Sequence, residues 1–209
     1  MDVEALMHLT QESKPILTKE IIAFMSQIQD KRVILYLANF LSYKNKSIKL
    51  GAIQTLGKIG DEPTNKILLG FISDADEEVR TAAAEKLKFF HDRQLLKYIF
   101  NLVSDKAFIK KSLKEKRAFF DFLGRSQSEQ ACDFLRKILK KYSFFPFPKQ
   151  KEACLCAVRA LEMMATAAAK DILKEGAKKQ RGKIREACLQ ALKNTAECDK
   201  PSSSEGTTT

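Results

Sequence analysis

Apolar residues recur along this chain at the spacing of an amphipathic helix, and the same helical pattern returns at nearly regular intervals. Aligning the successive helices places five small residues in one column, at intervals of 31, 36, 35 and 34 residues: Gly51, Ala82, Ala118, Ala153 and Ala187. A second column, five residues further on, holds Leu56, Leu87, Leu123, Val158 and Leu192. Both columns lie on one side of a 3.6-residue helix, so each repeat offers the same apolar stripe to its neighbours.

A period in the thirties, made of paired helices, predicts an all-α fold of the α-solenoid (superhelix) type. We expect about five helix pairs in one continuous solenoid over residues 1–195, with an N-terminal capping helix over residues 15–29. The predicted repeats span residues 31–59, 62–90, 92–125, 127–165 and 167–195. The remaining segment, 196–209, is rich in Ser and Thr, has little to bury and is expected to be disordered.

The turns between the predicted helices carry capping signals. Gly60 suits a left-handed helix end, Asp61 suits the N-cap of the next helix, and Pro63 falls in its first turn. The third repeat has about five extra residues over 106–111, which we expect to project from the edge of the solenoid. In the fourth repeat, prolines interrupt an aromatic loop that either packs over the joint or remains an apolar contact site: Tyr142, Phe144, Phe145 and Phe147.

Two stretches carry a resemblance to a known family: GAIQTLGKIGD over residues 51–61 and DADEEVRTAA over residues 74–83. They resemble the HEAT-repeat family, in particular the short bacterial type also called PBS-lyase HEAT-like. The resemblance is specific over residues 48–90 and weakens towards both ends. It implies an α-solenoid whose second helices line the concave side, and binding or scaffolding more often than catalysis.

Two enzyme branches of this family resemble the chain in fold, and its residues favour neither. Bilin lyases enclose a chromophore, for which this sequence shows no distinguishing feature. HEAT-like DNA glycosylases use aromatic residues, typically tryptophan, and a catalytic aspartate, whereas this chain has no tryptophan. Asp121, near Arg117 and Arg125, is better explained as a solvated helix acid. We therefore predict no enzyme and no catalytic residue.

Cysteine usage predicts neither disulfides nor a metal or cofactor site. The five cysteines include no CxxC pair, and there are two histidines in the chain. Cys154 and Cys188 share a core column with Ala52 and Ala83, which indicates small buried hydrophobic residues. The apolar runs are too short to span a bilayer, and the first residues lack the pattern of a signal peptide, so we expect a cytoplasmic protein.

The net charge of +11 is concentrated in the second half of the chain. Residues 1–105 hold 14 basic and 14 acidic residues, whereas residues 106–195 hold 22 basic and 9 acidic ones. Such an asymmetry concerns the partners of a protein rather than its fold. It predicts an acidic partner for the C-terminal repeats.

One cation stands two residues before the small-residue column in every repeat: Lys49, Arg80, Lys116, Lys151 and Arg185. In the related repeats this cation commonly pairs with an aspartate that precedes the helix. Asp74 is the expected partner of Arg80, whereas the aligned Tyr43, Lys110, Phe145 and Lys179 cannot accept such a pair. The unpartnered cations are either solvated structural remnants or an anion-binding strip.

The leading hypothesis is a non-catalytic scaffold or adaptor that binds an acidic protein surface or peptide on its C-terminal concave half. The candidate partner-binding or anion-binding residues are Lys116, Arg117, Arg125, Lys151, Arg159, Arg185 and Lys193. The alternative is a sequence-independent nucleic-acid-binding protein, since aligned cations can neutralise successive phosphates. No membrane partner is predicted, and the sequence indicates no oligomeric state.

Overall fold

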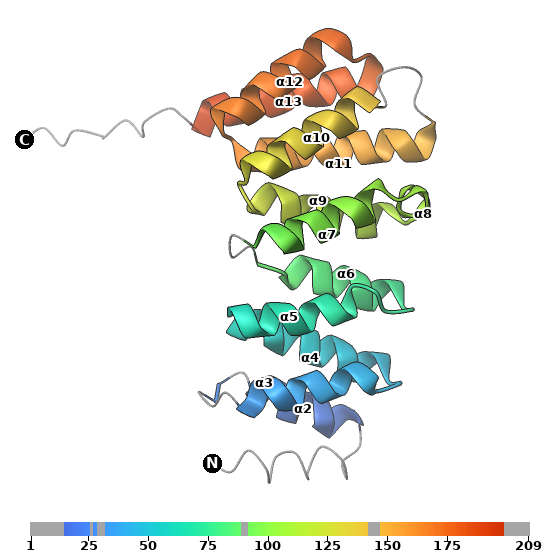
Figure 1. Ribbon diagram of the computed structural model, residues 1–209, viewed down its shortest axis with the longest axis vertical. Helices are drawn as coiled ribbons and strands as arrows, with labels where there is room; N and C mark the ends of the chain where they lie inside the picture. The colour runs from blue at the N-terminus through green and yellow to red at the C-terminus, as the bar shows by residue number, and fades with distance from the viewer. Residues whose placement is uncertain (1–14, 26, 29–31, 89–91, 142–146, 199–209) are drawn as a thin grey trace, which may run out of the picture. The chain divides into compact units, whose positions relative to one another are not determined.

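The computed structural model describes residues 15–25, 27–28, 32–88, 92–141 and 147–198, and every regular element in these ranges is a helix (Figure 1). The helix α2 (Pro15–Met25) comes first. Two helix pairs follow in unit 1: α3 (Arg32–Asn39, extended by the 3-10 helix η1, Phe40–Ser42) with α4 (Lys46–Ile59), and α5 (Glu62–Phe71) with α6 (Glu77–Lys86). Next along the chain come α7 (Arg93–Ser104) and α9 (Leu113–Arg125). The last two pairs are α10 (Glu129–Lys141) with α11 (Pro148–Met164), and α12 (Ala167–Lys179) with α13 (Gly182–Cys198).

The chain divides into two compact units, each with its own internal contacts. Unit 1 comprises Met1–Asp92 and Ser112–Phe122, and unit 2 comprises Arg93–Lys111 and Leu123–Thr209. Helix α9 contributes residues to both units. The last helix, α13, ends at Cys198, three residues beyond the predicted end of the fifth repeat, and residues 199–209 of the predicted tail lie outside the described part.

In unit 1 the predicted turn signals determine where helices end and begin. Gly60 has φ +61° and closes α4 in the left-handed conformation, which favours glycine. The Asp61 side chain then accepts a hydrogen bond from the Thr64 backbone N–H at 3.0 Å, and Pro63 occupies the first turn of α5, where no amide hydrogen is needed. Asp76 caps α6 in the same way, accepting from the Glu78 N–H at 2.8 Å.

The core of unit 1 forms between consecutive second helices and the helices beside them. Helix α4 packs against α2, α5 and α6, and its Ile53 and Leu56 have no exposed surface. The Thr55 hydroxyl donates to the Ile22 carbonyl oxygen at 3.0 Å and so satisfies a buried polar group between α4 and α2. Neighbouring repeats are therefore held by both apolar burial and matched polar contacts.

In unit 2 helix α11 is the most enclosed element, because it packs against α10, α12 and α13. Its small residues Ala157 and Ala160 have no exposed surface and allow the close approach of these helices. The extra joint over 106–111 differs from the prediction that it projects from the edge. Its residues form a short helix, α8 (Lys106–Lys110), which contacts α7 and α11 and buries Phe108 to 2% exposure.

Candidate functional site

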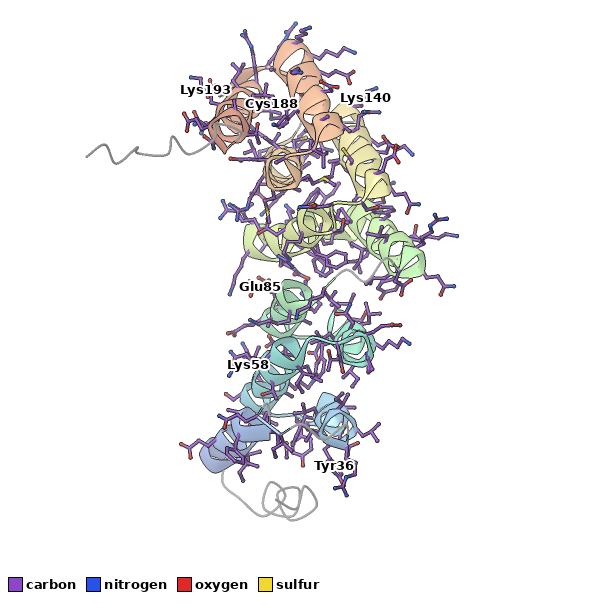
Figure 2. All side chains as sticks on the ribbon, turned by 90° about the vertical axis from the view of Figure 1, so that its left-hand side faces the viewer. Tyr36, Lys58, Glu85, Lys140, Cys188 and Lys193 are labelled. Carbon is purple, nitrogen blue, oxygen red and sulfur yellow. The ribbon has the colours of Figure 1, made fainter. Side chains whose placement is uncertain are left out.

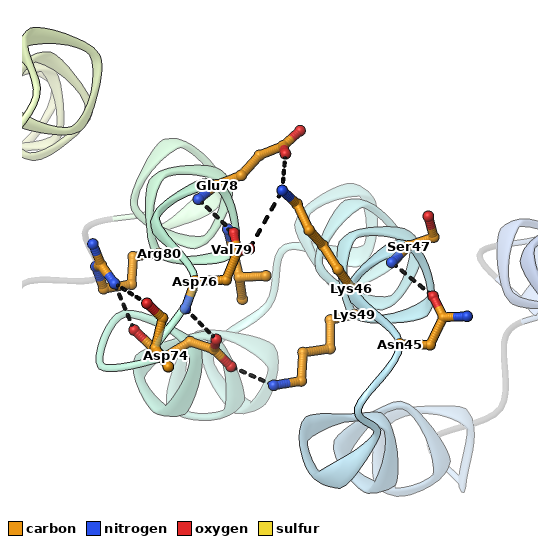
Figure 3. Close-up of polar contacts among 10 residues, drawn as sticks. Asn45, Lys46, Ser47, Lys49, Asp74, Asp76, Glu78, Val79 and Arg80 are labelled. Carbon is orange, nitrogen blue, oxygen red and sulfur yellow. Dashed lines mark hydrogen bonds and ion pairs between the residues drawn. The ribbon is translucent and has the colours of Figure 1, made fainter.

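The aligned cations of the first two repeats are tied to acids of the following repeat. In unit 1, Lys49 Nζ on α4 lies 2.5 Å from Asp74 Oδ2, in the turn before α6 (Figure 3). Arg80 on α6 donates from Nε and Nη2 to the two carboxylate oxygens of Glu115 on α9, at 2.7 and 3.0 Å. Each cation thus joins its own repeat to the next.

This pairing corrects the sequence prediction for both cations. Lys49 does have an acidic partner, and the carboxylate of Asp74 binds Lys49 rather than Arg80. The Arg80 Nη1 group instead donates to the backbone carbonyl oxygens of Asp74 and Ala75, both at 2.8 Å (Figure 3). The alignment failed because it searched for the acid within the same repeat, whereas both acids belong to the repeat that follows.

The electrostatics of these pairs follow from their geometry. Burial by itself raises the pKa of Asp74, but the hydrogen bonds from Lys49 and from the Asp76 backbone N–H outweigh it, so the pKa of Asp74 lies below its ordinary value. The hydrogen bond to Glu115 raises the pKa of Arg80 despite partial burial. Asp74 and Arg80 therefore remain charged around neutral pH, and each forms an ion pair with another residue of the protein.

Lys116, a predicted anion-binding residue, is fully buried at 0% exposure, and that prediction was wrong. Its neighbour Glu115 is equally buried. In unit 1, Lys49 and Arg80 of the same column are also largely covered, because they pair with acids of the following repeat. A side chain without exposed surface has no access to an external partner.

The other predicted cations keep solvent access. Lys151 is half-buried, and five are exposed: Arg117, Arg125, Arg159, Arg185 and Lys193. Arg185 occupies the same column as Lys116 but lies on α13, which no later described helix covers. The cation of this column is therefore exposed to solvent in the last described repeat.

Arg117 lies in a mixed-charge hollow of unit 1 rather than on a basic surface. The hollow has a volume of about 390 Å³ and is lined by Lys114, Arg117, Glu85 and Asp121, with Leu113 and Ala118 between them. Two cations and two acids leave it without net charge. This hollow therefore offers no electrostatic preference for an anion.

In unit 2 the candidate cations other than Arg125 lie on α11 and α13, which pack on each other. The Asn194 side chain of α13 donates to Glu162 Oε1 of α11 at 2.5 Å, and Arg159 precedes Glu162 by three residues on α11. Lys193 lies on the outer surface of α13, whereas Lys140 of α10 lies on the opposite side of the unit (Figure 2). We call Arg159, Arg185 and Lys193 the basic face of unit 2.

Large apolar side chains accompany the basic face. Met163, one turn after Arg159, is 37% exposed, and Leu189, between Arg185 and Lys193, is 43% exposed. Positions four residues apart are neighbours on a helix surface. The basic face therefore combines cations with apolar contact area, a combination that the sequence columns did not single out.

One of the four aromatic residues of the predicted loop lies within the described ranges. Tyr142, Phe144 and Phe145 lie outside the described residues. Phe147 is described: it precedes α11 as its N-cap residue, accepts the Gln150 backbone N–H through its carbonyl oxygen at 2.9 Å, and is 74% exposed.

The cysteines behave as the sequence predicted for small core residues. Cys154 and Cys188 have no exposed surface, and burial raises the pKa of their thiols to about 12 and about 11. Within the described ranges, no group of three or more His, Cys, Asp or Glu side chains is placed to hold a metal ion. Nor does any helix there combine the length and apolar character needed to cross a membrane.

Comparisons with known proteins identify the repeats. A family model for HEAT repeats matches residues 3–88. Among solved structures, an engineered protein matches with a TM-score of 0.54 and 17% identity, covering 94% of this chain and 98% of that one. No curated protein matches in the sequence search.

Two further structures are similar at a lower level. An archaeal HEAT-like repeats protein from Thermococcus onnurineus NA1 matches with a TM-score of 0.43 and 14% identity, covering 94% of this chain and 98% of its own. Human deoxyhypusine hydroxylase matches with a TM-score of 0.37 and 17% identity, covering 92% and 83%. At these TM-scores neither likeness carries an argument about activity.

The family match and the helix pairs agree with the residues that first indicated the repeat, namely those over 51–61 and 74–83. Residues 3–88 match the HEAT-repeat family model, and the described residues have an all-α fold of HEAT-like helix pairs.

Proposed function

We propose that this HEAT-repeat protein is a non-catalytic scaffold whose basic face, Arg159, Arg185 and Lys193 of unit 2, binds an acidic protein surface or peptide. Solenoids of stacked repeats present extended surfaces and commonly act through binding. The proposal takes its location from charge, because residues 106–195 hold the whole basic surplus of the chain.

The observation that carries the proposal is the contrast between the tied and the exposed cations. Lys49 and Arg80 form ion pairs with Asp74 and Glu115, and the side chains of the two cations are only 17% and 16% exposed. The residues of the basic face are exposed instead. An exposed cation is accessible to an external carboxylate, whereas a cation covered by its neighbours is not.

The apolar side chains beside these cations favour a protein over a nucleic acid. Met163 and Leu189 offer area for burial, which contributes to protein association at roughly 25 cal/mol per Å² before the costs of binding. The acids Glu162 and Glu186 lie on the same two helices, so the face suits a ligand with acidic groups at separate points better than a backbone with a charge at every phosphate. A peptide that carries both acidic and apolar residues complements this mixed surface.

The test is a titration of the full chain with two labelled probes, followed by fluorescence anisotropy. One probe is a peptide of glutamate and leucine arranged to form an amphipathic helix, and the other is a single-stranded oligothymidine. Each is titrated at low and at high salt. Phosphate binding weakens steeply with salt because counterions are released, whereas apolar contacts persist.

We expect the peptide to bind at both salt concentrations and more tightly than the oligonucleotide. The contrary result is an oligonucleotide complex with a steep salt dependence together with no binding of the peptide. That result would replace the protein-binding proposal with the nucleic-acid alternative.

A further inference from the structure

Unit 2 contains a second candidate site, away from the basic face. A hollow of about 470 Å³ lies between α10 and α12, which contact each other. This volume falls within the range of small-molecule sites, roughly 300 to 1,000 Å³. Lys140, on its rim, lies on the opposite side of the unit from Lys193 of the basic face (Figure 2).

The floor of the hollow is apolar and held in place by a buried hydrogen bond. Leu139 and Ile172 line it with exposures of 3% and 2%. Gln180, itself 5% exposed, donates from Nε2 to the Leu139 carbonyl oxygen at 2.9 Å, joining the end of α12 to the end of α10. A floor fixed in this way is largely formed before any ligand arrives.

The rim is charged, with cations outnumbering acids three to one. Glu175 Oε1 lies 2.8 Å from Lys179 Nζ and 3.6 Å from Lys140 Nζ, so it holds both lysines at the opening. The hydrogen bond from Lys179 lowers the pKa of Glu175 despite some desolvation, which keeps this acid charged. Arg136 is the third cation, and the lining keeps a positive balance.

Arg136 is the rim residue whose hydrogen-bonding capacity is least used. Its Nη1 group donates to the exposed Asp133 at 3.2 Å on the same helix. Its Nε atom is buried and has no hydrogen-bond partner among the described residues. A buried donor without an acceptor is unfavourable, and an anionic oxygen beside this guanidinium offers one after a small side-chain rotation.

We infer that the hollow between α10 and α12 binds a small organic anion, with one phosphate or carboxylate group at Arg136, Lys140 and Lys179 and an apolar body against Leu139 and Ile172. The guanidinium gives the head group a planar pair of donors, and the lysines add charge without fixed direction. Inorganic phosphate has no apolar part to contact this floor, so it is expected to bind more weakly than an organic anion. This inference is independent of the proposed function, because it uses other helices and other residues.

The inference is tested by calorimetric titration of the full chain with three probes: phenyl phosphate, inorganic phosphate and benzyl alcohol. Phenyl phosphate carries both the anionic and the apolar part, and each of the others carries one of them. We expect phenyl phosphate to bind at least about tenfold more tightly than either, since each part contributes its own contacts. A benzoate titration then separates carboxylate from phosphate as the preferred head group.

Two variants test the role of the rim. Arg136→Gln is expected to weaken phenyl phosphate binding at least about tenfold, the effect of losing one charge-assisted hydrogen bond. Lys137→Gln is the matched control, because Lys137 is the next residue on α10, is exposed and does not line the hollow. Circular dichroism melting curves verify that both variants remain folded.

Three results would each overturn the inference. They are equal binding of phenyl phosphate by wild type and Arg136→Gln, equal weakening by both variants, and binding of benzyl alcohol as tight as that of phenyl phosphate. An absence of saturation with millimolar phenyl phosphate would refute it as well. Selective loss in Arg136→Gln together with preference for the amphiphilic anion supports it.

Discussion

The ion pair between Arg80 and Glu115 allows the contacts between repeats to be tested quantitatively. The Glu115 side chain is 1% exposed and accepts two hydrogen bonds from the Arg80 guanidinium. In the variant Arg80→Met the carboxylate stays buried and loses the guanidinium that donates two hydrogen bonds to it. Removal of one partner from a buried pair costs about 3–5 kcal/mol of unfolding free energy. We expect a loss of that size.

The reverse variant is expected to be milder. In Glu115→Met the remaining charge belongs to Arg80, which keeps 16% exposure and still donates to the backbone carbonyls of Asp74 and Ala75. A loss of about 1–3 kcal/mol is expected. The double variant removes both charges of this pair, so we expect it to be more stable than Arg80→Met alone.

The assay is urea denaturation followed by circular dichroism at 222 nm. Urea is preferred because guanidinium chloride is a salt that screens ion pairs, and the chain has no tryptophan to report by fluorescence. The matched control is Lys66→Met, which breaks a surface pair with Glu62 whose side chains are 72% and 66% exposed. The control is expected to cost less than about 1 kcal/mol.

The reasoning fails if the losses in the two single variants add up in the double variant. Additive losses would mean that Arg80 and Glu115 act independently. It also fails if Arg80→Met is no more destabilising than Lys66→Met, because burial of Glu115 would then carry no electrostatic cost.

Three further predictions concern unit 1 and the buried thiols. Because the pKa of Asp74 is lowered in the folded state, its ionised form stabilises the fold above the unfolded pKa of about 3.8, and this stabilisation is lost as pH falls through the folded pKa. Urea titrations at several pH values should show the unfolding free energy falling over this range. In Asp74→Asn the unfolding free energy should change less with pH over the same range. Cys154 and Cys188, with thiol pKa values raised by burial to about 12 and about 11, should react with a thiol reagent at pH 8 only after denaturation; rapid labelling of the native protein would contradict their burial. Gly60→Ala should lower the unfolding free energy by about 1 kcal/mol, because φ is +61° there; an unchanged urea midpoint would show that the left-handed turn relaxes freely.

The fold was predictable because its signals are local. The 3.6-residue periodicity and the turn at Gly60 and Asp61 are properties of neighbouring residues, and the structure confirms them. The joint over 106–111 was not predicted correctly, because its helix α8 contacts α11, which lies far along the sequence. Such a contact leaves no periodic trace in the sequence.

The candidate site was predicted less well, for a related reason. Helical register places Lys49, Lys116 and Arg185 in one column, but it does not say which side of the column the next repeat covers. As a result Lys116 was predicted to be exposed, although it is buried, while Arg185 in the same register is exposed. The hollow between α10 and α12 escaped notice because it depends on how side chains from two separate helices meet.

The most direct test of the proposed function compares two charge-matched double variants in the titration with the acidic peptide. Arg159→Glu with Arg185→Glu reverses two cations of the basic face, whereas Lys137→Glu with Lys178→Glu makes the same charge change at exposed positions of α10 and α12. We predict a loss of affinity of at least about tenfold in the first double variant and little change in the second. Equal affinities for the two variants would contradict the assignment of the binding surface to α11 and α13.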